Sequence, residues 1–293
     1  MPTVDLGFQK YSITVKLKEF LTPGNWKDKG EKIFDFLGKL EKPTVVCFDE
    51  ISVFINTLCK VQNSSKDART EAEEFLRFLR HMSIQHKDQL CMIYCGSIGF
   101  TPILKRTDLS ETVNTFERFP VDLWQANTAI GCLCALANYK DLAYESGAES
   151  ILVERLRYCV PEHVQMLSTE LHDQCRRKNS DLITQGDVEN KLQSLWSGDK
   201  GKQELSRYTK HLQQIFEPDD FKLAERILTE TARNDMLPDT VFDAFCRQAA
   251  TVSNSKVEMV KDCLIDELYL EEIPGGYRFV MPLLHQLWKK HYK

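Results

Sequence analysis

Residues 44–50, Thr-Val-Val-Cys-Phe-Asp-Glu, decide how the rest of this chain is interpreted. The apolar run 44–48 predicts a buried strand, and the two carboxylates that follow it, Asp49 and Glu50, then lie at its C-terminal tip. Open α/β sheets bind their ligands at the C-terminal ends of the strands. We therefore expect a functional site here. The alternative is that the two acids open a surface helix or loop.

The segments around this stretch alternate between strand and helix. Strands are predicted at 11–17, 44–48 and 90–95, and the last of these runs into Gly96-Ser97. A further strand is a candidate at 119–123. Amphipathic helices are predicted at 26–40 and from 67 to about 86. This alternation is typical of an α/β layer.

After residue 125 the pattern becomes helical. A small bundle is predicted from four segments, 126–144, 149–157, 161–177 and 185–196. The stretch 197–201, Ser-Gly-Asp-Lys-Gly, is the clearest linker candidate.

The last ninety residues carry a third pattern. Helices fit 219–234, 238–250 and 255–268, a hairpin turn is predicted at 274–276, and a closing helix begins near Pro282. Three helices followed by a hairpin are the outline of a winged helix. The sequence therefore predicts three domains, at 1–125, 126–197 and 202–293.

Composition places few limits on function. The 293 residues carry a net charge of −5, so the chain as a whole has no electrostatic attraction to nucleic acid or anionic membranes. The longest apolar stretch, 129–137, is too short to span a bilayer. Ten cysteines without a Cys-x-x-Cys pair favour reduced, buried thiols in a cytoplasmic protein without a signal peptide.

The order of these segments resembles the archaeal-type ATPases, a STAND branch of the AAA-like P-loop NTPases. The matching stretches are Val-Val-Cys-Phe-Asp-Glu-Ile at 45–51, Ile-Tyr-Cys-Gly-Ser-Ile-Gly at 93–99, and Tyr-Arg-Phe at 277–279 followed by Pro-Leu-Leu at 282–284 and Trp288. The resemblance covers nearly the whole chain. It implies an α/β fold with a partial P-loop NTPase sheet of the ASCE type, followed by a helical lid bundle and a C-terminal winged helix.

The resemblance also implies roles for individual residues. Asp49 looks like the Mg²⁺ ligand of a Walker B strand, and Glu50 like the general base that orients the attacking water. Ser97 stands where such enzymes place a polar sensor of the γ-phosphate of ATP, although a hydroxyl that caps the strand end is an equal alternative. Arg106 and Arg118 are both candidates for the arginine that stabilises transition-state charge, and both also fit surface arginines.

One further position carries over from the family only in part. The family usually has a Gly-x-Pro turn that contacts the adenine. The corresponding stretch in this chain is Tyr-Cys-Val-Pro at 158–161, in which Cys159 replaces the glycine and only Pro161 is retained.

The chain contains no Gly-x-x-x-x-Gly-Lys-Ser/Thr loop, and the nearest imitation, at 198–202, has the wrong spacing. Three explanations remain open. The chain is a fragment of a longer ATPase, a degenerate regulator with a rebuilt sheet, or one half of a site whose missing strand a partner chain supplies. Without the strand that carries this loop, the strand at 90–95 is expected to have an unpaired edge. The chain alone is expected to bind ATP weakly or not at all.

Three functions follow from this resemblance. The first is an ATP-dependent molecular switch, the second a non-catalytic protein-interaction or regulatory scaffold, and the third a winged-helix DNA-binding regulator. The third winged-helix helix carries two lysines, Lys256 and Lys261, against four acids, Glu258, Asp262, Asp266 and Glu267. Because this surplus of acids repels phosphate, we expect a protein or intramolecular partner for that domain.

Overall fold

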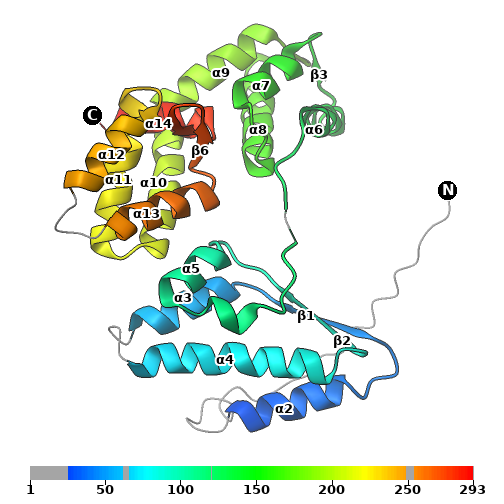
Figure 1. Ribbon diagram of the computed structural model, residues 1–293. Coiled ribbons are helices and arrows are strands. Elements are labelled where there is room, and N and C mark those ends of the chain that lie inside the picture. Colours follow the sequence, from blue (N-terminus) through cyan, green and yellow to red (C-terminus); the bar gives the residue numbers. More distant parts are fainter. Residues whose placement is uncertain (1–25, 62–65, 120, 249–253, 293) are drawn as a thin grey trace.

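The computed structural model describes residues 26–61, 66–119, 121–248 and 254–292. The strand predicted at 11–17 lies outside these residues. Within them the chain is mixed α/β but mostly helical, with two small parallel sheets and an antiparallel sheet near the C-terminus. The elements form three groups that follow one another along the chain (Figure 1).

The first group is built on a two-stranded parallel sheet. Strand β1 (Thr44–Phe48) pairs with β2 (Leu90–Tyr94) in the register Thr44↔Leu90 to Phe48↔Tyr94. The other elements of this group are α2 (Trp26–Leu37), α3 (Ile51–Val61), α4 (Lys66–Gln85), α5 (Phe100–Thr107) and the 3-10 helix η1 (Ser110–Val113).

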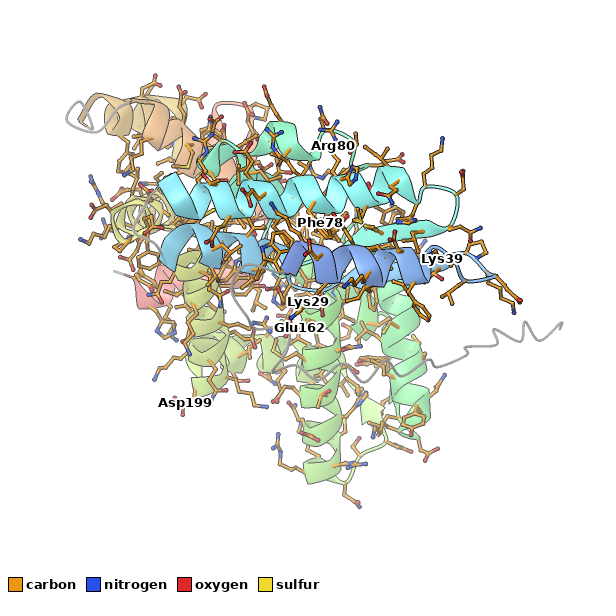
Figure 2. The ribbon with its side chains drawn as sticks, turned by 90° about the horizontal axis from the view of Figure 1, so that it is seen from below. Lys29, Lys39, Phe78, Arg80, Glu162 and Asp199 are labelled. Atoms are coloured by element: carbon orange, nitrogen blue, oxygen red, sulfur yellow. The ribbon has the colours of Figure 1, made fainter. Side chains whose placement is uncertain are left out.

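Helix α4 contributes four side chains to the core beneath this sheet. Its apolar positions at helical spacing are buried, and they are Ala72, Leu76, Leu79 and Met82. Phe78 points from α4 toward α2 (Figure 2). Its ring lies 2.6 Å from where a Cβ at Gly30 would stand, so α2 approaches α4 closely because residue 30 has no side chain.

The opposite face of the sheet is open. Val45 is 59% exposed and Ile93 48% exposed, and Cys47 and Cys91 on the same face are exposed as well. Parallel sheets are normally covered on both faces, and no element of the described residues covers this one. The prediction of buried thiols is therefore wrong for Cys47, Cys91 and also Cys95, whereas Cys159, Cys175 and Cys263 are buried.

The candidate strand at 119–123 is not formed by the residues of it that the structure describes, 119 and 121–123. Phe119 and Val121 are each 87% exposed, and the first pairing along this segment is an isolated bridge between Trp124 and Cys159. A strand needs a neighbour to satisfy its backbone groups, and the described residues offer none at this position. The missing neighbour explains why Phe119 and Val121 stay exposed.

The second group contains four helices, as predicted. They are α6 (Ala126–Tyr139), α7 (Ala148–Leu156), α8 (Pro161–Lys178) and α9 (Gln185–Ser197), with a short parallel pair of β3 (Ala143–Tyr144) and β4 (Leu182–Ile183). A capping box fixes the start of α9, because Thr184 Oγ1 accepts from the Asp187 amide at 3.1 Å and the Asp187 carboxylate accepts from the Thr184 amide at 3.1 Å.

The third group is built on α10 (Asp199–Ile215), which the sequence did not predict. The expected linker at 197–201 is reduced to a break at Gly198, because residues 199–201 already form the first turn of α10. The predicted helices and hairpin are confirmed as α11 (Pro218–Arg233), α12 (Asp239–Gln248), α13 (Asn254–Asp266), β6 (Leu270–Ile273) and β7 (Gly276–Phe279), with β5 (Leu237–Pro238) on the other edge of β7. Helix α14 (Pro282–His291) closes the group at the predicted proline.

None of the helices in the described residues is long and apolar enough to cross a bilayer.

Candidate functional site

The two acids and the serine that the sequence singled out meet at one end of the first sheet. Asp49 and Glu50 follow β1 directly, and Ser97 follows β2 after two residues. Because the strands are parallel, their C-terminal ends share an edge. Both the amide and the Oγ of Ser97 donate to Glu50 Oε2, at 2.9 and 2.8 Å. We refer to Asp49, Glu50 and Ser97 together as the acid tip.

Glu50 adopts a backbone conformation that non-glycine residues rarely use. Its φ of +56° lies in the left-handed region. Such residues persist where their surroundings hold them, and they are frequent at functional sites. Here the two hydrogen bonds from Ser97 hold the Glu50 side chain, and the Asp49 carboxylate accepts a hydrogen bond from the Glu50 amide at 3.0 Å. The conformation turns Glu50 out of the strand direction and across to β2.

Asp49 lies beside a thiol from the neighbouring strand end. Cys95 Sγ donates to Asp49 Oδ1 at 3.6 Å. Desolvation, and then the Asp49 carboxylate, raise the pKa of the Cys95 thiol, so the thiol stays protonated and acts as the donor. Within the described residues no three His, Cys, Asp or Glu side chains converge as a metal site. The acid tip therefore offers carboxylate oxygens for at most a part of a cation's coordination shell.

The other predicted site residues belong to other elements. Arg106 belongs to α5, and Arg118 is exposed beyond η1, where it lines a cavity along β2. Pro161 is the first residue of α8, two residues after Cys159, whose carbonyl accepts from the Trp124 amide at 3.0 Å. The structure thus brings together Asp49, Glu50 and Ser97, and it gives Pro161 no contact with them.

The cavity along β2 has a volume of about 500 Å³. Its walls include both Ile93 and Tyr94, which point to opposite faces of the sheet, so the cavity follows the free edge of the strand. Tyr94 and Phe116 of this wall stack with ring centroids 4.6 Å apart, and Phe48 stacks on Tyr94 with centroids 5.3 Å apart. The edge that the sequence predicted to be unpaired is unpaired in the described residues, and apolar groups surround it.

A charged cluster connects the second group to the hairpin of the third. Glu271 of β6 accepts from Arg157 Nη2 at 2.6 Å, from Arg278 Nε at 2.7 Å and from the Tyr158 hydroxyl at 2.7 Å. Burial alone would raise the pKa of Glu271, but the hydrogen bonds from Tyr158 and Arg278 and the charges of both arginines lower it below its ordinary value. The cluster is therefore stabilising above the ordinary glutamate pKa, and it loses this contribution as pH falls below that value.

Replacing Glu271 with Ala tests this cluster. We expect the free energy of unfolding to fall by about 1–3 kcal/mol, because two arginines and a tyrosine lose their acceptor in a partly buried site. The neighbouring Glu272 is exposed, so Glu272→Ala should stay within about 0.5 kcal/mol of the parent in the same urea titration. Equal effects of the two substitutions would show that the cluster contributes no stability.

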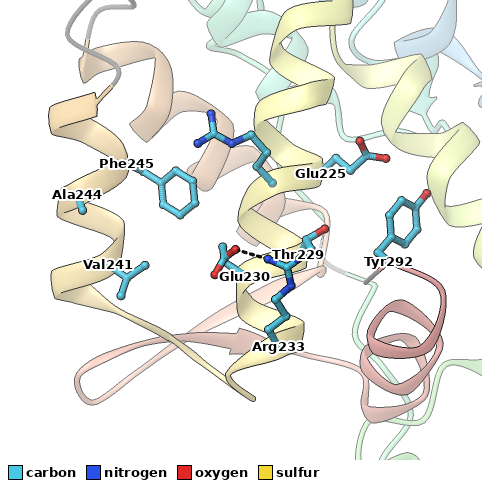
Figure 3. Close-up of a pocket in the computed structure, with 9 residues that line it drawn as sticks. Glu225, Thr229, Glu230, Arg233, Val241, Ala244, Phe245 and Tyr292 are labelled. Atoms are coloured by element: carbon cyan, nitrogen blue, oxygen red, sulfur yellow. Dashed lines mark hydrogen bonds and ion pairs between the residues drawn. The ribbon is translucent and has the colours of Figure 1, made fainter.

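A second cavity of about 500 Å³ lies in the third group, between α11, α12 and Tyr292 (Figure 3). Arg233 pairs with Glu230 at 2.8 Å, and the Arg226 guanidinium lies 5.2 Å from the centre of the Phe245 ring. With Glu225, the cavity has two arginines and two glutamates among its walls. The charges cancel, so this cavity does not favour a phosphate.

Sequence reasoning missed the side chains that connect the third group to the acid tip. The Nε2 atom of His211, in α10, lies 3.0 Å from the carbonyl oxygen of Ser97. Glu267 accepts a hydrogen bond from the Gly99 amide at 2.6 Å. Asn56 of α3 also donates to the carbonyl of Gln214, at 2.5 Å. These residues are more than a hundred positions apart in the chain. Their spacing therefore gave no signal, and only the docking of the groups brings them together.

Comparison with known proteins places the fold. The Walker-type ATPase PABY2304 of Pyrococcus abyssi superposes with a TM-score of 0.59 at 15% sequence identity, over 95% of this chain and 72% of that one. The RuvB Holliday junction branch migration motor of Thermotoga maritima gives a TM-score of 0.39 at 15% identity, over 85% and 71%. No family model matches the chain, and no curated protein matches it either. The chain therefore resembles Walker-type ATPases in fold.

Proposed function

We propose that this chain is part of an ATP-dependent molecular switch of the STAND type, seen without its phosphate-binding loop. The observation that carries the proposal is the acid tip: two consecutive carboxylates and a serine at the ends of adjacent parallel strands, joined by two hydrogen bonds from Ser97 to Glu50. The similarity in fold to a Walker-type ATPase supports the same proposal.

In this proposal each residue of the acid tip has one task. Asp49 is a ligand of Mg²⁺, which usually takes one or two carboxylates from a protein and completes its shell with phosphates and water. Glu50 takes a proton from the attacking water, and Ser97 senses the γ-phosphate. Bound Mg²⁺·ATP supplies the metal charge and the transferable phosphoryl group. In the present arrangement Ser97 donates to Glu50, so a phosphate that attracts Ser97 would release the base.

The other candidate site residues are two arginines, of which one is proposed to act, and Pro161. Arg106 or Arg118 stabilises charge on the transferred group, and Pro161 contacts the adenine. The proposed domains are a truncated P-loop NTPase core at 1–125, a helical lid at 126–197 and a winged helix at 202–293.

We further propose that a strand carrying the phosphate-binding loop pairs with the free edge of β2. The apolar cavity along that edge supports this, as does the open sheet face around Val45 and Ile93. A parallel sheet of two strands is otherwise poorly stabilised. The strand comes either from a segment that precedes Met1 or from a partner protein.

A non-catalytic interaction scaffold is the second candidate. It is favoured by the contacts that already occupy the acid tip. Ser97 donates a hydrogen bond to Glu50, and the C-terminal helices dock on the loop after β2. A scaffold that kept the fold without hydrolysis would need no phosphate-binding loop.

A DNA-binding regulator is disfavoured by the contacts of α13. Lys256 pairs with Asp220 at 2.7 Å and Lys261 with Asp262 at 3.3 Å, so both lysines of the helix have acidic partners. The helix also packs against α5 (Figure 1). A recognition helix needs a free basic face to enter the major groove.

The test begins with the codons that precede Met1 in the same reading frame. If they encode a Gly-x-x-x-x-Gly-Lys-Ser/Thr loop, the extended chain is purified and titrated with Mg²⁺·ATP, and we expect saturable binding that a Lys→Ala change in the loop abolishes. An independent start site without such a loop, together with no gain of binding from any partner that co-purifies, would favour the scaffold. Retention on DNA that weakens with salt would favour the regulator.

A further inference from the structure

The C-terminal helices hold the loop after β2 through two titratable side chains. Glu267 Oε1 accepts from the Gly99 amide at 2.6 Å, and His211 Nε2 lies 3.0 Å from the Ser97 carbonyl. The second oxygen of Glu267 lies 3.4 Å from the same His211 nitrogen. Ser97 and Gly99 both belong to the segment that leads from β2 into α5. His211 and Glu267 therefore contact the backbone on both sides of Ile98, directly beside the acid tip.

The contact between Glu267 and the loop after β2 is buried and closely packed. The Glu267 side chain is 7% exposed and the His211 side chain 23%. A Cβ at Gly99 would collide with Glu267 Oε1, so the carboxylate reaches the amide only because residue 99 is a glycine. An acid buried to this extent is costly to ionise unless a positive charge or several donors accompany it.

The hydrogen bonds around His211 and Glu267 require one shared proton. The Tyr269 hydroxyl donates its single proton to the Tyr208 carbonyl at 2.8 Å, and its oxygen lies 3.0 Å from His211 Nδ1. With that proton committed, Tyr269 can only accept from Nδ1. The Ser97 carbonyl likewise can only accept from Nε2. A neutral ring beside an ionised Glu267 would leave the unprotonated Nε2 facing two acceptors. The pair therefore needs one shared proton, either on His211 or on Glu267, whose second oxygen lies 3.4 Å from Nε2.

We propose that His211 and Glu267 form a proton-dependent latch, which holds the C-terminal helices on the loop after β2 and loosens when the pair loses its shared proton. The latch contacts the backbone carbonyl of Ser97, and the side chain of the same residue holds Glu50. It thus connects the docking of the C-terminal helices to the geometry of the acid tip.

Other charged and titratable groups surround the pair. They come from α10, α13, the turn after α13 and the acid tip, and they are Arg207, Tyr208, Cys263, Asp266, Tyr269 and Glu50. Arg207 opposes a charge on His211, and Asp266 opposes a charge on Glu267. Both influences shift the shared proton from His211 toward Glu267, and they have opposite effects on the total number of protons that the pair holds. The contact from Asn56 to Gln214 does not titrate and keeps α10 near α3 at any pH.

The titration of the pair gives the sign of the pH dependence. Burial raises the pKa of Glu267 to about 7, and burial lowers the pKa of His211 below its ordinary value. The docked pair therefore keeps one proton, on either partner, up to about pH 7. Once released, the pair keeps that proton only on a free histidine, with a pKa of about 6.5. The docked state then binds more protons than the released state, so docking weakens as pH rises through about 7.

The protection of the Gly99 amide against hydrogen exchange, measured by NMR, reports this docking directly. Between pH 6 and pH 8 we expect the protection factor of the whole chain, corrected for the intrinsic exchange rate, to fall about two- to threefold, which is the linkage for a half-unit difference in pKa. In Glu267→Gln the side-chain amide can donate to Nε2 of a neutral ring, and of the pair only His211 titrates. Burial disfavours the charged ring, so docking should strengthen and the protection factor should rise over the same range.

Two further variants complete the experiment. Glu258→Gln removes an exposed carboxylate of α13 that does not act on the pair, and it should keep the fall seen in the parent chain. Gly99→Ala should lose protection of the residue 99 amide at both pH values, because the added Cβ displaces Glu267. The amide of Leu171, buried in α8, reports that each variant is folded. The latch would be overturned if the protection factor of the Gly99 amide in the parent chain stays level or rises between pH 6 and pH 8. It would also be overturned if the protection factor in Glu267→Gln falls as it does in the parent.

Discussion

Glu50→Gln is expected to lower ATP turnover by about 10²–10⁴-fold in a form of the protein that carries a phosphate-binding loop, while Mg²⁺·ATP still binds. The amide keeps the shape of the side chain and can still accept from Ser97, but it cannot take a proton from water. The effect should therefore fall on kcat, with little change in the affinity measured by titration. Single-turnover measurements with saturating ATP separate the two quantities.

Glu41→Gln is a matched control for this substitution. Glu41 is exposed and precedes β1, at the opposite end of the strand from the acid tip. Its replacement should leave turnover and affinity unchanged. Turnover that survives in Glu50→Gln would show that another group serves as the base, and would remove the catalytic role that we propose for the acid tip.

Trp288→Ala is expected to lower the free energy of unfolding by about 3–5 kcal/mol. Trp288 is fully buried in α14, and its indole stacks at 4.4 Å on Tyr292 and lies 6.2 Å from the Phe279 ring. Its Nε1 also donates to Thr229 Oγ1 at 3.2 Å. Truncation leaves a cavity between α14, α11 and β7 and a hydroxyl without its donor. Urea unfolding followed by circular dichroism measures the loss.

Trp26→Ala is the control for the size of the residue. Trp26 is 36% exposed and packs against Phe75 and Phe78 from one side only. Its removal should cost less than half as much as that of Trp288, because the site remains open to water and encloses no cavity. Equal losses from the two substitutions would contradict the packing described for the third group.

The sequence predicted those parts of the fold that carry their own periodicity. Helix α4, the four helices of the second group and the C-terminal hairpin follow from apolar spacing, turn residues and a proline at the start of α14. The meeting of Glu50 with Ser97 was also predictable, because two successive buried strands joined by a helix lie parallel and end at one edge.

The parts that the sequence did not predict depend on neighbours. Helices α3, α5 and α10 were missed, and residues 199–201 were mistaken for a linker because two glycines outweighed the helical pattern that follows. The strand at 119–123 was predicted from composition alone, but a strand exists only beside a partner. His211 and Glu267 lie on segments with no local motif, so their contact with the loop after β2 emerges only from the packing of α10 and α13 on the first group.

The most direct measurement of the central claim is a calorimetric titration of the 293-residue chain with Mg²⁺·ATP, accompanied by an assay for released phosphate. The acid tip has carboxylates for a metal, but the chain has no Gly-x-x-x-x-Gly-Lys-Ser/Thr loop whose amides and lysine would hold the β- and γ-phosphates. We predict affinity weaker than about 1 mM, equivalent to about 4 kcal/mol of binding free energy, and no turnover above background. ATP hydrolysis by this chain that disappears in Glu50→Gln would contradict the account.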